Sequence, residues 1–458
     1  MYANTPPAPH PHPADLRRFR AGELTDVHVV PVRLHIRRYM RQARPDLVTM
    51  DGMVTSSAPV HVSDHTSPFA AAFPGLRRPG ADGRPFVHAD APGGTQVTDS
   101  VITAMSDYLR RSNANPTRGF ATSVETAELI ASVRERCAGL LGADADGVVL
   151  GGSTTMLIWH FARAFAATLN PGDNIVCTQL DHEANVSPWL AIARSRGAEV
   201  RLVPLDPETF ELDYSALPQL VDERTRLVAF TRSSNLIGSI VRVEPFVEAA
   251  RSVGALTFSD GVAAAAHRPL NQLAHGIDIS VCSAYKFFGP HLALLTARPD
   301  LLDRLAPDRI RPAPASGPRR WELGTPALES IAGLGAAVDY LTETGYPAIS
   351  AHERELTVRA LDGIRRLPHV RLHGLDSAEG REPIFAVTVE RRSTHEVASR
   401  LADRGVFVAA GDSYARECAQ ALGLPASEGA VRFGLVHYHG ADDVDRILEA
   451  LADLRPGS

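Results

Sequence analysis

The stretch SVCSAYKFFGPH, residues 280–291, decides how the rest of this sequence is interpreted. An apolar run leads to Lys286, which two phenylalanines and a Gly-Pro turn follow, in a chain whose cationic side chains are mostly arginines. A lysine in this setting is either a surface residue beside a turn or a functional amine at the end of a strand. One short motif is weak evidence, so the neighbouring segments have to decide between the two interpretations.

Length and composition predict an ordinary globular protein with two domains. The chain has 458 residues, which is more than one hydrophobic core usually supports. Hydrophobic residues make up 44% and charged residues 22% of it, and these proportions exclude a disordered chain, a collagen or a coiled coil as the main architecture. The formal net charge of -6 gives no field that would favour nucleic acid or an anionic membrane, so neither partner is expected.

The sequence also predicts a cytoplasmic protein without a metal site. It has no run of about 18 apolar residues that would span a bilayer, and its start, MYANTPPAPHPHPADLRRFR, lacks the apolar core of a signal peptide. The four cysteines are far apart and the histidines are mostly single, so no metal-ligand spacing is present. In a cytoplasm the cysteines are expected to be free thiols.

The order of the expected strands and helices indicates a mostly parallel sheet. Residues 1–65 mix a proline- and histidine-rich start with a basic segment, and we expect an arm or lid of uncertain order there. Strands then alternate with helices up to a linker rich in Pro, Gly and Arg at 309–320, a pattern typical of a parallel sheet with helices on both faces. We predict a large domain at 96–312 and a smaller domain built from 66–95 with 313–458.

Polar motifs follow successive strands of this predicted sheet. GGSTT (151–155) joins a strand to a helix, where amides and hydroxyls can hold an anion, although a plain helix cap has the same pattern. His182 and Asn235 follow later strands, Asp260 ends another and Lys286 ends the last. Each of them alone is compatible with a structural role. Because ligands of such sheets bind at the carboxyl ends of the strands, the set predicts one site.

Taken in this order, a phosphate cradle, a stacking histidine, an asparagine, an aspartate and a lysine resemble the class V aminotransferase and cysteine desulfurase family of pyridoxal 5'-phosphate (PLP) enzymes. The most specific segments are DHEANVSPW (181–189) and SAYKFFGPH (283–291). The resemblance extends over about residues 85–450 and leaves the amino-terminal arm unmatched. It implies the PLP-dependent transferase fold type I, an α/β fold with a mostly parallel seven-stranded sheet in the large domain and a smaller α+β domain.

The resemblance also implies the roles of individual residues. Lys286 would hold PLP as an internal Schiff base and act as the catalytic base, because a lysine among apolar neighbours loses preference for its charged form. Asp260 would pair with the pyridinium nitrogen, so that electron density from the substrate's α carbon can flow into the ring. His182 would stack on the ring face, and Asn235 would face the phenolic oxygen. The other implied cofactor contacts are Ser153, Thr154, Thr155, Ser283 and Thr325.

Substrate and subunit contacts follow from the same resemblance. Thr325, in WELGTPAL, matches a loop position that reaches the neighbouring subunit's phosphate in this family, so a homodimer is implied. Arg432, in VRFGLVHYH, matches the arginine that grips the α-carboxylate of an amino-acid substrate with two hydrogen bonds. Further candidates for substrate binding are Gly94, Thr95, Asn115 and Tyr414.

Two departures from the family pattern narrow the expected reaction. Desulfurases carry a nucleophilic cysteine on a loop of the small domain, where this chain has AAGDSYARECA (409–419). Cys418 lies later in this segment, where we expect a buried structural thiol, so persulfide chemistry is disfavoured. Three residues after Asp260, family members usually have a glutamine or histidine that contacts the phenolic oxygen, and this chain has Ala263, which leaves space there.

These features predict a PLP-dependent lyase. We expect a carbon-sulfur β-lyase that removes the α proton of a cysteine S-conjugate, in bacterial secondary metabolism such as antibiotic biosynthesis, because lincosamide-type enzymes that process cysteine conjugates resemble this family. Two alternatives keep the cofactor: decarboxylation with oxidative deamination to an aldehyde, and epimerisation or transamination. A PLP-fold scaffold that no longer catalyses is less favoured, because Lys286, Asp260, His182 and Arg432 occur together.

Overall fold

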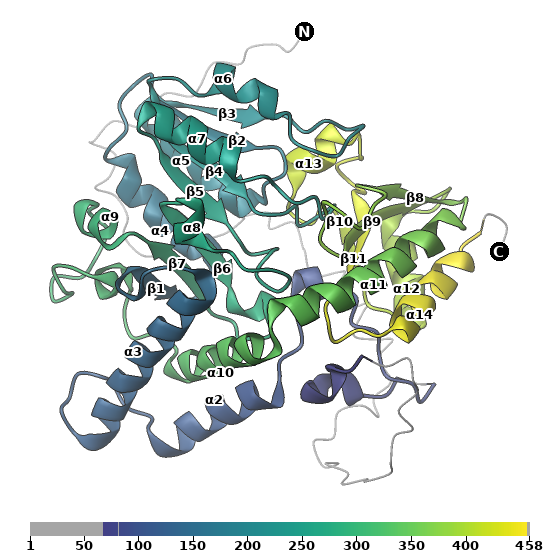
Figure 1. Ribbon diagram of the computed structural model, residues 1–458, viewed down its shortest axis with the longest axis horizontal. Helices are drawn as coiled ribbons and strands as arrows, with labels where there is room; N and C mark the ends of the chain where they lie inside the picture. The colour runs from purple at the N-terminus through teal and green to yellow at the C-terminus, as the bar shows by residue number, and fades with distance from the viewer. Residues whose placement is uncertain (1–66, 81, 456–458) are drawn as a thin grey trace, which may run out of the picture. The chain divides into compact units, whose positions relative to one another are not determined.

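The computed structural model describes residues 67–80 and 82–455 (Figure 1), which belong to one unit of the chain, Val62–Ser458. The arm predicted at 1–65 lies outside the described residues. Among the helices of the described ranges, none is both long and apolar enough to cross a membrane.

A seven-stranded sheet occupies the middle of the sequence and has the strand order β1-β7-β6-β5-β4-β2-β3. The four pairs of neighbouring strands formed by β2 to β6 are parallel, whereas β7 runs antiparallel to both β1 and β6. The mostly parallel seven-stranded sheet expected from the sequence is therefore confirmed. The strands are β1 (Val148–Gly151), β2 (Asn174–Thr178), β3 (Glu199–Val203), β4 (Thr225–Thr231), β5 (Leu256–Asp260), β6 (Ile279–Ser283) and β7 (Ala293–Ala297).

One face of this sheet is covered by α4 (Thr154–Ala166) and α5 (Ser187–Arg196). Alternate strand residues, among them Ile175 and Val281, point to this layer and belong to the same apolar cluster as Phe161 of α4. Because successive side chains of a strand point to opposite faces, the residues between them must be covered from the other side.

The opposite face is covered by α3 (Ala121–Leu141), α7 (Glu244–Val253) and α10 (Leu328–Thr344). Val176 packs toward α7, and Cys282 packs toward α3 and α10. With both faces buried, the strands are nearly continuous apolar runs such as ALLTA in β7, which is the pattern that distinguishes them from half-exposed antiparallel strands.

A second sheet has four antiparallel strands in the order β10-β11-β9-β8. The strands are β8 (Val370–His373), β9 (Ile384–Val389), β10 (Ala409–Gly411) and β11 (Ala430–Gly434). Helices α11 (Tyr346–Arg365), α12 (Thr394–Asp403) and α14 (Ala441–Ala452) contribute to its separate apolar core. Isolated bridges attach the early residues Val87 and Asp90 to Val406 and Gly434. The boundaries of the two expected domains stay a prediction.

The remaining α-helices of the described ranges are one longer helix, which contributes Tyr108 to the same apolar core as α3 and α10, and four short ones. They are α2 (Asp99–Arg111), α6 (Leu217–Leu220), α8 (Gln272–His275), α9 (Pro299–Arg304) and α13 (Arg416–Ala421). The 3-10 helices η3 to η10 are Ala70–Ala72, Pro74–Arg77, Ala91–Gly93, Ala145–Gly147, Glu183–Asn185, Tyr214–Ala216, Ala284–Lys286 and Pro318–Trp321.

A turn after β4 fastens the two sheets together through backbone contacts. The amide of Glu382 donates to the carbonyl of Gly238 (2.8 Å), and the amide of Ile240 donates to the carbonyl of Gly380 (2.8 Å). Gly238 has φ +79°, and a Cβ there would lie 2.7 Å from the carbonyl oxygen of Glu382 and 2.8 Å from that of Ile384. This close approach positions the turn that carries Asn235.

We expect Gly238→Ala to lower the free energy of unfolding by about 3 kcal/mol or more, because it adds both a strained left-handed residue and a backbone clash. Gly254→Ala is the matched control: Gly254 also has positive φ (+72°), but no atom lies within 4 Å of its added Cβ. The control should lose only about 1 kcal/mol. Urea denaturation of both variants measures the difference, and equal losses would contradict the packing argument.

Candidate functional site

A pocket of about 320 Å³ lies at the carboxyl ends of the parallel strands. Its walls come from the segments that follow β1, β2, β4 and β6, from the end of β5, and from β10 and β11 of the second sheet. The pocket brings together ten of the residues expected from the sequence: Ser153, Thr154, Thr155, His182, Asn235, Asp260, Ser283, Lys286, Tyr414 and Arg432.

Lys286 ends the 3-10 turn that follows β6. Its side-chain nitrogen donates to the carbonyl oxygen of Pro92 and lies 5.2 Å from the centre of the Tyr285 ring. Burial lowers the pKa of Lys286 to about 7, and Arg432 adds to this effect while Asp260 opposes it. Near neutral pH a large fraction of the amine is therefore uncharged, and an uncharged amine is a nucleophile and a base.

Asp260 is the last residue of β5 and is buried, with 3% of its surface exposed. Its Oδ1 accepts a hydrogen bond from the amide of Val262 (2.9 Å). Burial raises the pKa of Asp260 to about 6, although Val262 and Lys286 both favour the charged form. A carboxylate in this position gains stability from any cationic group that enters the pocket.

His182 caps the turn that follows β2, and its Nδ1 accepts a hydrogen bond from the amide of Ala184 (3.0 Å). Burial lowers the pKa of His182 to about 4, and Lys286 and Arg432 contribute. The ring is therefore neutral at pH 7 with its proton on Nε2. Its centre lies 5.5 Å from that of the Tyr414 ring, at an interplanar angle of 41°.

The segment DHEANVSPW contains a buried brace behind His182 that the sequence interpretation did not assign. Asp181 accepts hydrogen bonds from the amide and hydroxyl of Thr178 (3.0 and 2.6 Å) and from Nδ2 of Asn185 (2.8 Å). Asn185 in turn accepts one from Nε1 of Trp189 (3.1 Å). Burial raises the pKa of Asp181 to about 8, although the hydrogen bonds from Thr178 and Asn185 favour its charged form. Spacings of four residues along the segment were the signal for this brace.

The start of α4 forms an anion cradle. The hydroxyl of Ser153 accepts a hydrogen bond from the amide of Met156 (3.2 Å) and so begins the helix. The hydroxyl of Thr154 lies 2.6 Å from that of Ser283 at the end of β6. Two hydroxyls and the positive end of a helix thus meet at one corner of the pocket, an arrangement that favours a phosphate group.

Arg432 of β11 enters the pocket from the second sheet and is 6% exposed. Its Nη1 donates to the carbonyl of Asn235 (2.9 Å), and Nδ2 of Asn235 donates to the carbonyl of Ser413 (2.8 Å). Burial lowers the pKa of Arg432 to about 10. Within the described part of the chain, Nε of Arg432, Oδ1 of Asn235 and Oγ of Ser413 are buried and have no hydrogen-bond partner. Such orphaned atoms indicate a polar ligand.

Four of the expected residues do not line this pocket. Gly94 and Thr95 support its wall instead: Thr95 donates to the carbonyl of Tyr285 (3.1 Å) and accepts from the amide of Phe288 (2.8 Å). A Cβ on Gly94 would lie 3.3 Å from the Tyr285 ring. Asn115 and Thr325 are exposed and lie outside the pocket. Their roles stay predictions.

The pocket also contains residues that the sequence interpretation missed. The signal for Tyr285 was its position directly before Lys286, whereas the two alanines of β10 carry no chemical signature. Pro92 and Gly93 were not missed: they lie in APGGTQ (91–96), the glycine turn that the family resemblance implies at this pocket, and both line it. A stronger signal was overlooked, because Lys286 is the only lysine in the whole chain.

The two departures from the family pattern have clear structural consequences. Cys418 is fully buried in α13, and burial raises its pKa to about 12, so the expected structural thiol is confirmed. Instead of a thiol, the segment presents Ser413 and Tyr414, both with positive φ (53° and 59°). Ala263 lines the pocket, and its small side chain leaves room beside Lys286.

Comparisons with known proteins match this chain to the class V aminotransferases and to cysteine desulfurases. The family model described as Aminotransferase class-V matches residues 87–447. A cysteine desulfurase of Klebsiella pneumoniae subsp. pneumoniae is 33% identical over 402 residues, which covers 84% of this chain and 97% of the relative. A cysteine desulfurase of Pectobacterium carotovorum subsp. carotovorum is 31% identical over 386 residues, with 81% and 93% covered.

Solved structures show the same similarity. The cysteine desulfurase CsdA (S-sulfonic acid) from Escherichia coli aligns with a TM-score of 0.76 and 27% identity, covering 84% of this chain and 97% of that one. A C-DES mutant with glycine covalently linked to its PLP cofactor aligns with a TM-score of 0.73 and 18% identity, covering 84% and 100%. The second likeness concerns the fold alone.

We expect Lys286 in the cofactor-free protein to react with an amine reagent such as cyanate with a midpoint near pH 7, because burial holds its pKa there. The chain has no other lysine, so mass spectrometry of the single lysine peptide measures the reaction over a pH series. A model peptide with an exposed lysine serves as the control. A midpoint near 10 would contradict the burial of the amine.

Proposed function

We propose, from the premise that this chain belongs to the class V aminotransferase family and has PLP as its cofactor, that it is a carbon-sulfur β-lyase acting on a cysteine S-conjugate. The observation that carries the proposal is the replacement of the loop cysteine: Ser413 and Tyr414 face the pocket, and all four thiols of the chain are buried. Because no accessible thiolate can take up the sulfur, the sulfur atom leaves the cysteine carbon while still bonded to its S-substituent, as a thiol.

The residues of the pocket fit PLP. The phosphate matches the cradle at Thr154 and Ser283, and the aldehyde matches the uncharged amine of Lys286. A protonated ring nitrogen is the cationic partner that the buried carboxyl of Asp260 lacks. The neutral ring of His182 can cover one face of the cofactor, because its low pKa removes any charge that would resist stacking.

When bound, PLP supplies an electron sink for the negative charge that develops at the substrate's α carbon. Arg432 binds the α-carboxylate through Nη2 and Nε, since its Nη1 is held by the carbonyl of Asn235. Lys286 removes the α proton as an uncharged amine. The carbon-sulfur bond then breaks, and the sulfur leaves with the electron pair and takes up one proton. Asp260 holds the ring nitrogen in its protonated form throughout.

The proposal includes a cytoplasmic location and a role in bacterial secondary metabolism. The four cysteines are unpaired, which supports a reducing compartment. The metabolic role rests on the resemblance to lincosamide-type enzymes that process cysteine conjugates.

We expect the PLP-loaded protein to convert S-alkyl cysteines to a free thiol and 2-aminoacrylate, which one water molecule hydrolyses to pyruvate and ammonia, so that the three products form in equal amounts. Lys286→Ala should lower kcat by about 10²–10⁴-fold, because it removes the base. Cys418→Ala is the control and should retain activity, whereas a sulfur-carrying mechanism through this thiol would lose it. Thiol is assayed with a chromogenic disulfide and pyruvate by coupled reduction. Carbon dioxide and an aldehyde as the products would instead support oxidative decarboxylation.

We also propose a homodimer, in which Thr325 reaches the phosphate of the partner subunit. The exposed apolar side chains Met156 and Leu323 (both 61% exposed) support a covered surface near β1. Glu322, next to Leu323, accepts a hydrogen bond from the amide of Leu150 (2.9 Å), and the Met156 sulfur lies 3.6 Å from the position of a Cβ on Gly152.

Sedimentation equilibrium of the full chain should therefore give twice the chain mass. Leu323→Glu is expected to weaken this association at least tenfold, because it places a charge in an apolar contact. Leu273→Glu is the control, since Leu273 is also exposed (56%) and lies on α8, which does not carry Met156 or Leu323. A monomer at micromolar concentration would contradict the dimer.

A further inference from the structure

A second, small cavity of about 20 Å³ adjoins Lys286. Lys286 and His267 both line it, and the rest of its lining is apolar apart from backbone groups. Ala263 is part of this wall, so a longer side chain at this position would occupy the space. A cavity of this size is large enough for one water molecule when polar partners are present, and the amine and the imidazole are such partners.

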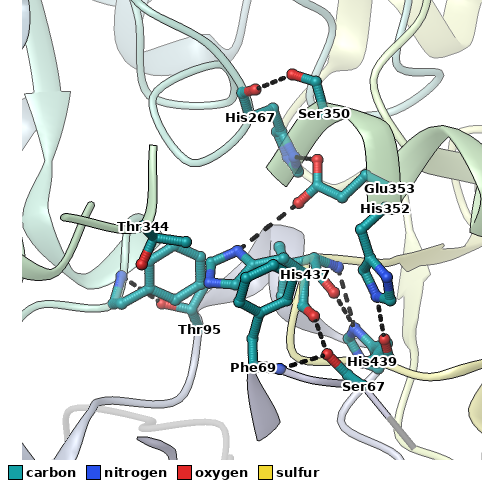
Figure 2. Close-up of polar contacts among 12 residues, drawn as sticks. Ser67, Phe69, Thr95, His267, Thr344, Ser350, His352, Glu353, His437 and His439 are labelled. Atoms are coloured by element: carbon teal, nitrogen blue, oxygen red, sulfur yellow. Dashed lines mark hydrogen bonds and ion pairs between the residues drawn. The ribbon is translucent and has the colours of Figure 1, made fainter. Parts of the chain in front are cut away.

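His267 begins a row of buried polar side chains (Figure 2). Its Nδ1 lies 2.8 Å from Oε2 of Glu353, and Figure 2 shows Glu353 between His267 and His437. Oε1 of Glu353 lies 4.0 Å from Nδ1 of His437, whose Nε2 lies 2.8 Å from the hydroxyl of Tyr340. The first three side chains are buried and Tyr340 is half-buried. The row therefore leads from the cavity beside Lys286 toward solvent.

Two buried atoms of the row lack a hydrogen-bond partner within the described part of the chain, which is unusual in a network that serves only to stabilise the fold. Oε1 of Glu353 and Nδ1 of His437 are buried, and neither has a hydrogen-bond partner among the described residues. The Phe288 ring, 4.5 Å from the His437 ring between centres, keeps this region apolar. A buried polar atom without a partner is destabilising, and these two atoms face each other 4.0 Å apart, so a small side-chain rotation would bring them into hydrogen-bond distance.

The surrounding charges keep His267 and Glu353 able to exchange a proton. Burial opposes a positive charge on His267, but Glu353 and Glu382 together raise its pKa, while Arg268 lowers it. Burial raises the pKa of Glu353, and Glu382 adds to this, whereas His267 and the backbone amide of His437 oppose it.

The next member of the row is neutral at pH 7. Burial lowers the pKa of His437 to about 3, and His267, His352 and His439 contribute. A neutral imidazole has one donor and one acceptor nitrogen, so it can accept a proton on one side and release one on the other.

We propose that His267, Glu353, His437 and Tyr340 form a proton relay that exchanges the protons of Lys286 with solvent. This relay rests on the proposed function, in which Lys286 removes the α proton of a bound amino acid. A proton on Lys286 passes to the cavity water, one proton moves on at each following link, and Tyr340 releases one to solvent. The reverse sequence restores the row. Only protons move, so no electron pair is gained or lost and no co-reactant is needed.

The relay gives Lys286 a proton path that does not use the mouth of the main pocket. A bound substrate covers that mouth, and a buried amine that has taken a proton would otherwise return it to the same α carbon. With the relay, the proton is replaced by one from solvent. His267 is therefore a positioning residue for the cavity water and the first proton carrier behind Lys286.

The test uses L-alanine in D₂O, because this amino acid has no β leaving group and can only exchange its α proton. Proton NMR measures the loss of the α-proton signal with the PLP-loaded full chain. We expect Tyr340→Phe and Glu353→Gln to slow the exchange at least about tenfold, as the loss of proton transfer does. Tyr346→Phe is the matched control, since Tyr346 donates to the carbonyl of Ala265 (2.8 Å) outside the relay.

The outcomes separate the relay from the proposed function. No exchange with the unaltered protein contradicts α-proton removal and thus the proposed function. Exchange that continues unchanged in Tyr340→Phe and Glu353→Gln overturns the relay alone. Tyr340 is at the half-buried end, so Tyr340→Phe keeps the test valid if Glu353→Gln does not fold.

A second measurement needs neither cofactor nor turnover. In the cofactor-free protein, Glu353→Gln is expected to raise the pKa of Lys286 by at least about 0.3 unit, because glutamine no longer favours the protonated form of His267, whose positive charge beside the cavity opposes protonation of the amine. Cyanate labelling of the single lysine over a pH series measures this shift. Tyr346→Phe should leave the midpoint unchanged. An unchanged or lowered midpoint in Glu353→Gln overturns the link between Lys286 and His267.

Discussion

The burial of one amine at the edge of the seven-stranded sheet is the constraint on which the site depends. Lys286 and Asp260 carry opposite charges, yet the pKa of each is shifted toward its neutral form, because burial outweighs their attraction. Two groups in direct contact would shift the other way. The two groups are therefore close without being in direct contact. A bound PLP ring with its nitrogen at Asp260 and its aldehyde at Lys286 would offset the cost of burying both groups.

The fold and the central part of the site could be predicted because they are encoded locally. Each strand of the large sheet is a short apolar run, and the polar residue that ends it must lie at the same edge as its neighbours in a parallel sheet. The segment DHEANVSPW was informative because it forms a buried hydrogen-bond network, which the sequence alone did not reveal. In this network Asp181, Asn185 and Trp189 stabilise the turn that holds His182. Buried braces restrict sequence more strongly than surface contacts do.

The rest could not be predicted because it joins residues that are distant in the sequence. His267 and Glu353 are 86 positions apart, and the contact depends on how α11 packs behind the sheet. Ala409 and Ala410 line the pocket through their place on β10 and not through their chemistry. Asn115 and Thr325 form a different case. Their roles come from a resemblance that concerns two subunits, and one chain places both of them on its surface.

The turn at Ser413 and Tyr414 is the part of the pocket that supports the proposal of a lyase that does not carry sulfur on a cysteine. Two successive residues with left-handed φ cost about 1–3 kcal/mol each. Two hydrogen bonds offset this cost. Nδ2 of Asn235 donates to the carbonyl of Ser413 (2.8 Å), and the backbone amide of Glu183 donates to the carbonyl of Tyr414 (2.7 Å). A cysteine that takes sulfur from a substrate and passes it on has to move between two partners. This turn is instead held by hydrogen bonds on both sides, and under the proposed function its fixed geometry would position a substrate.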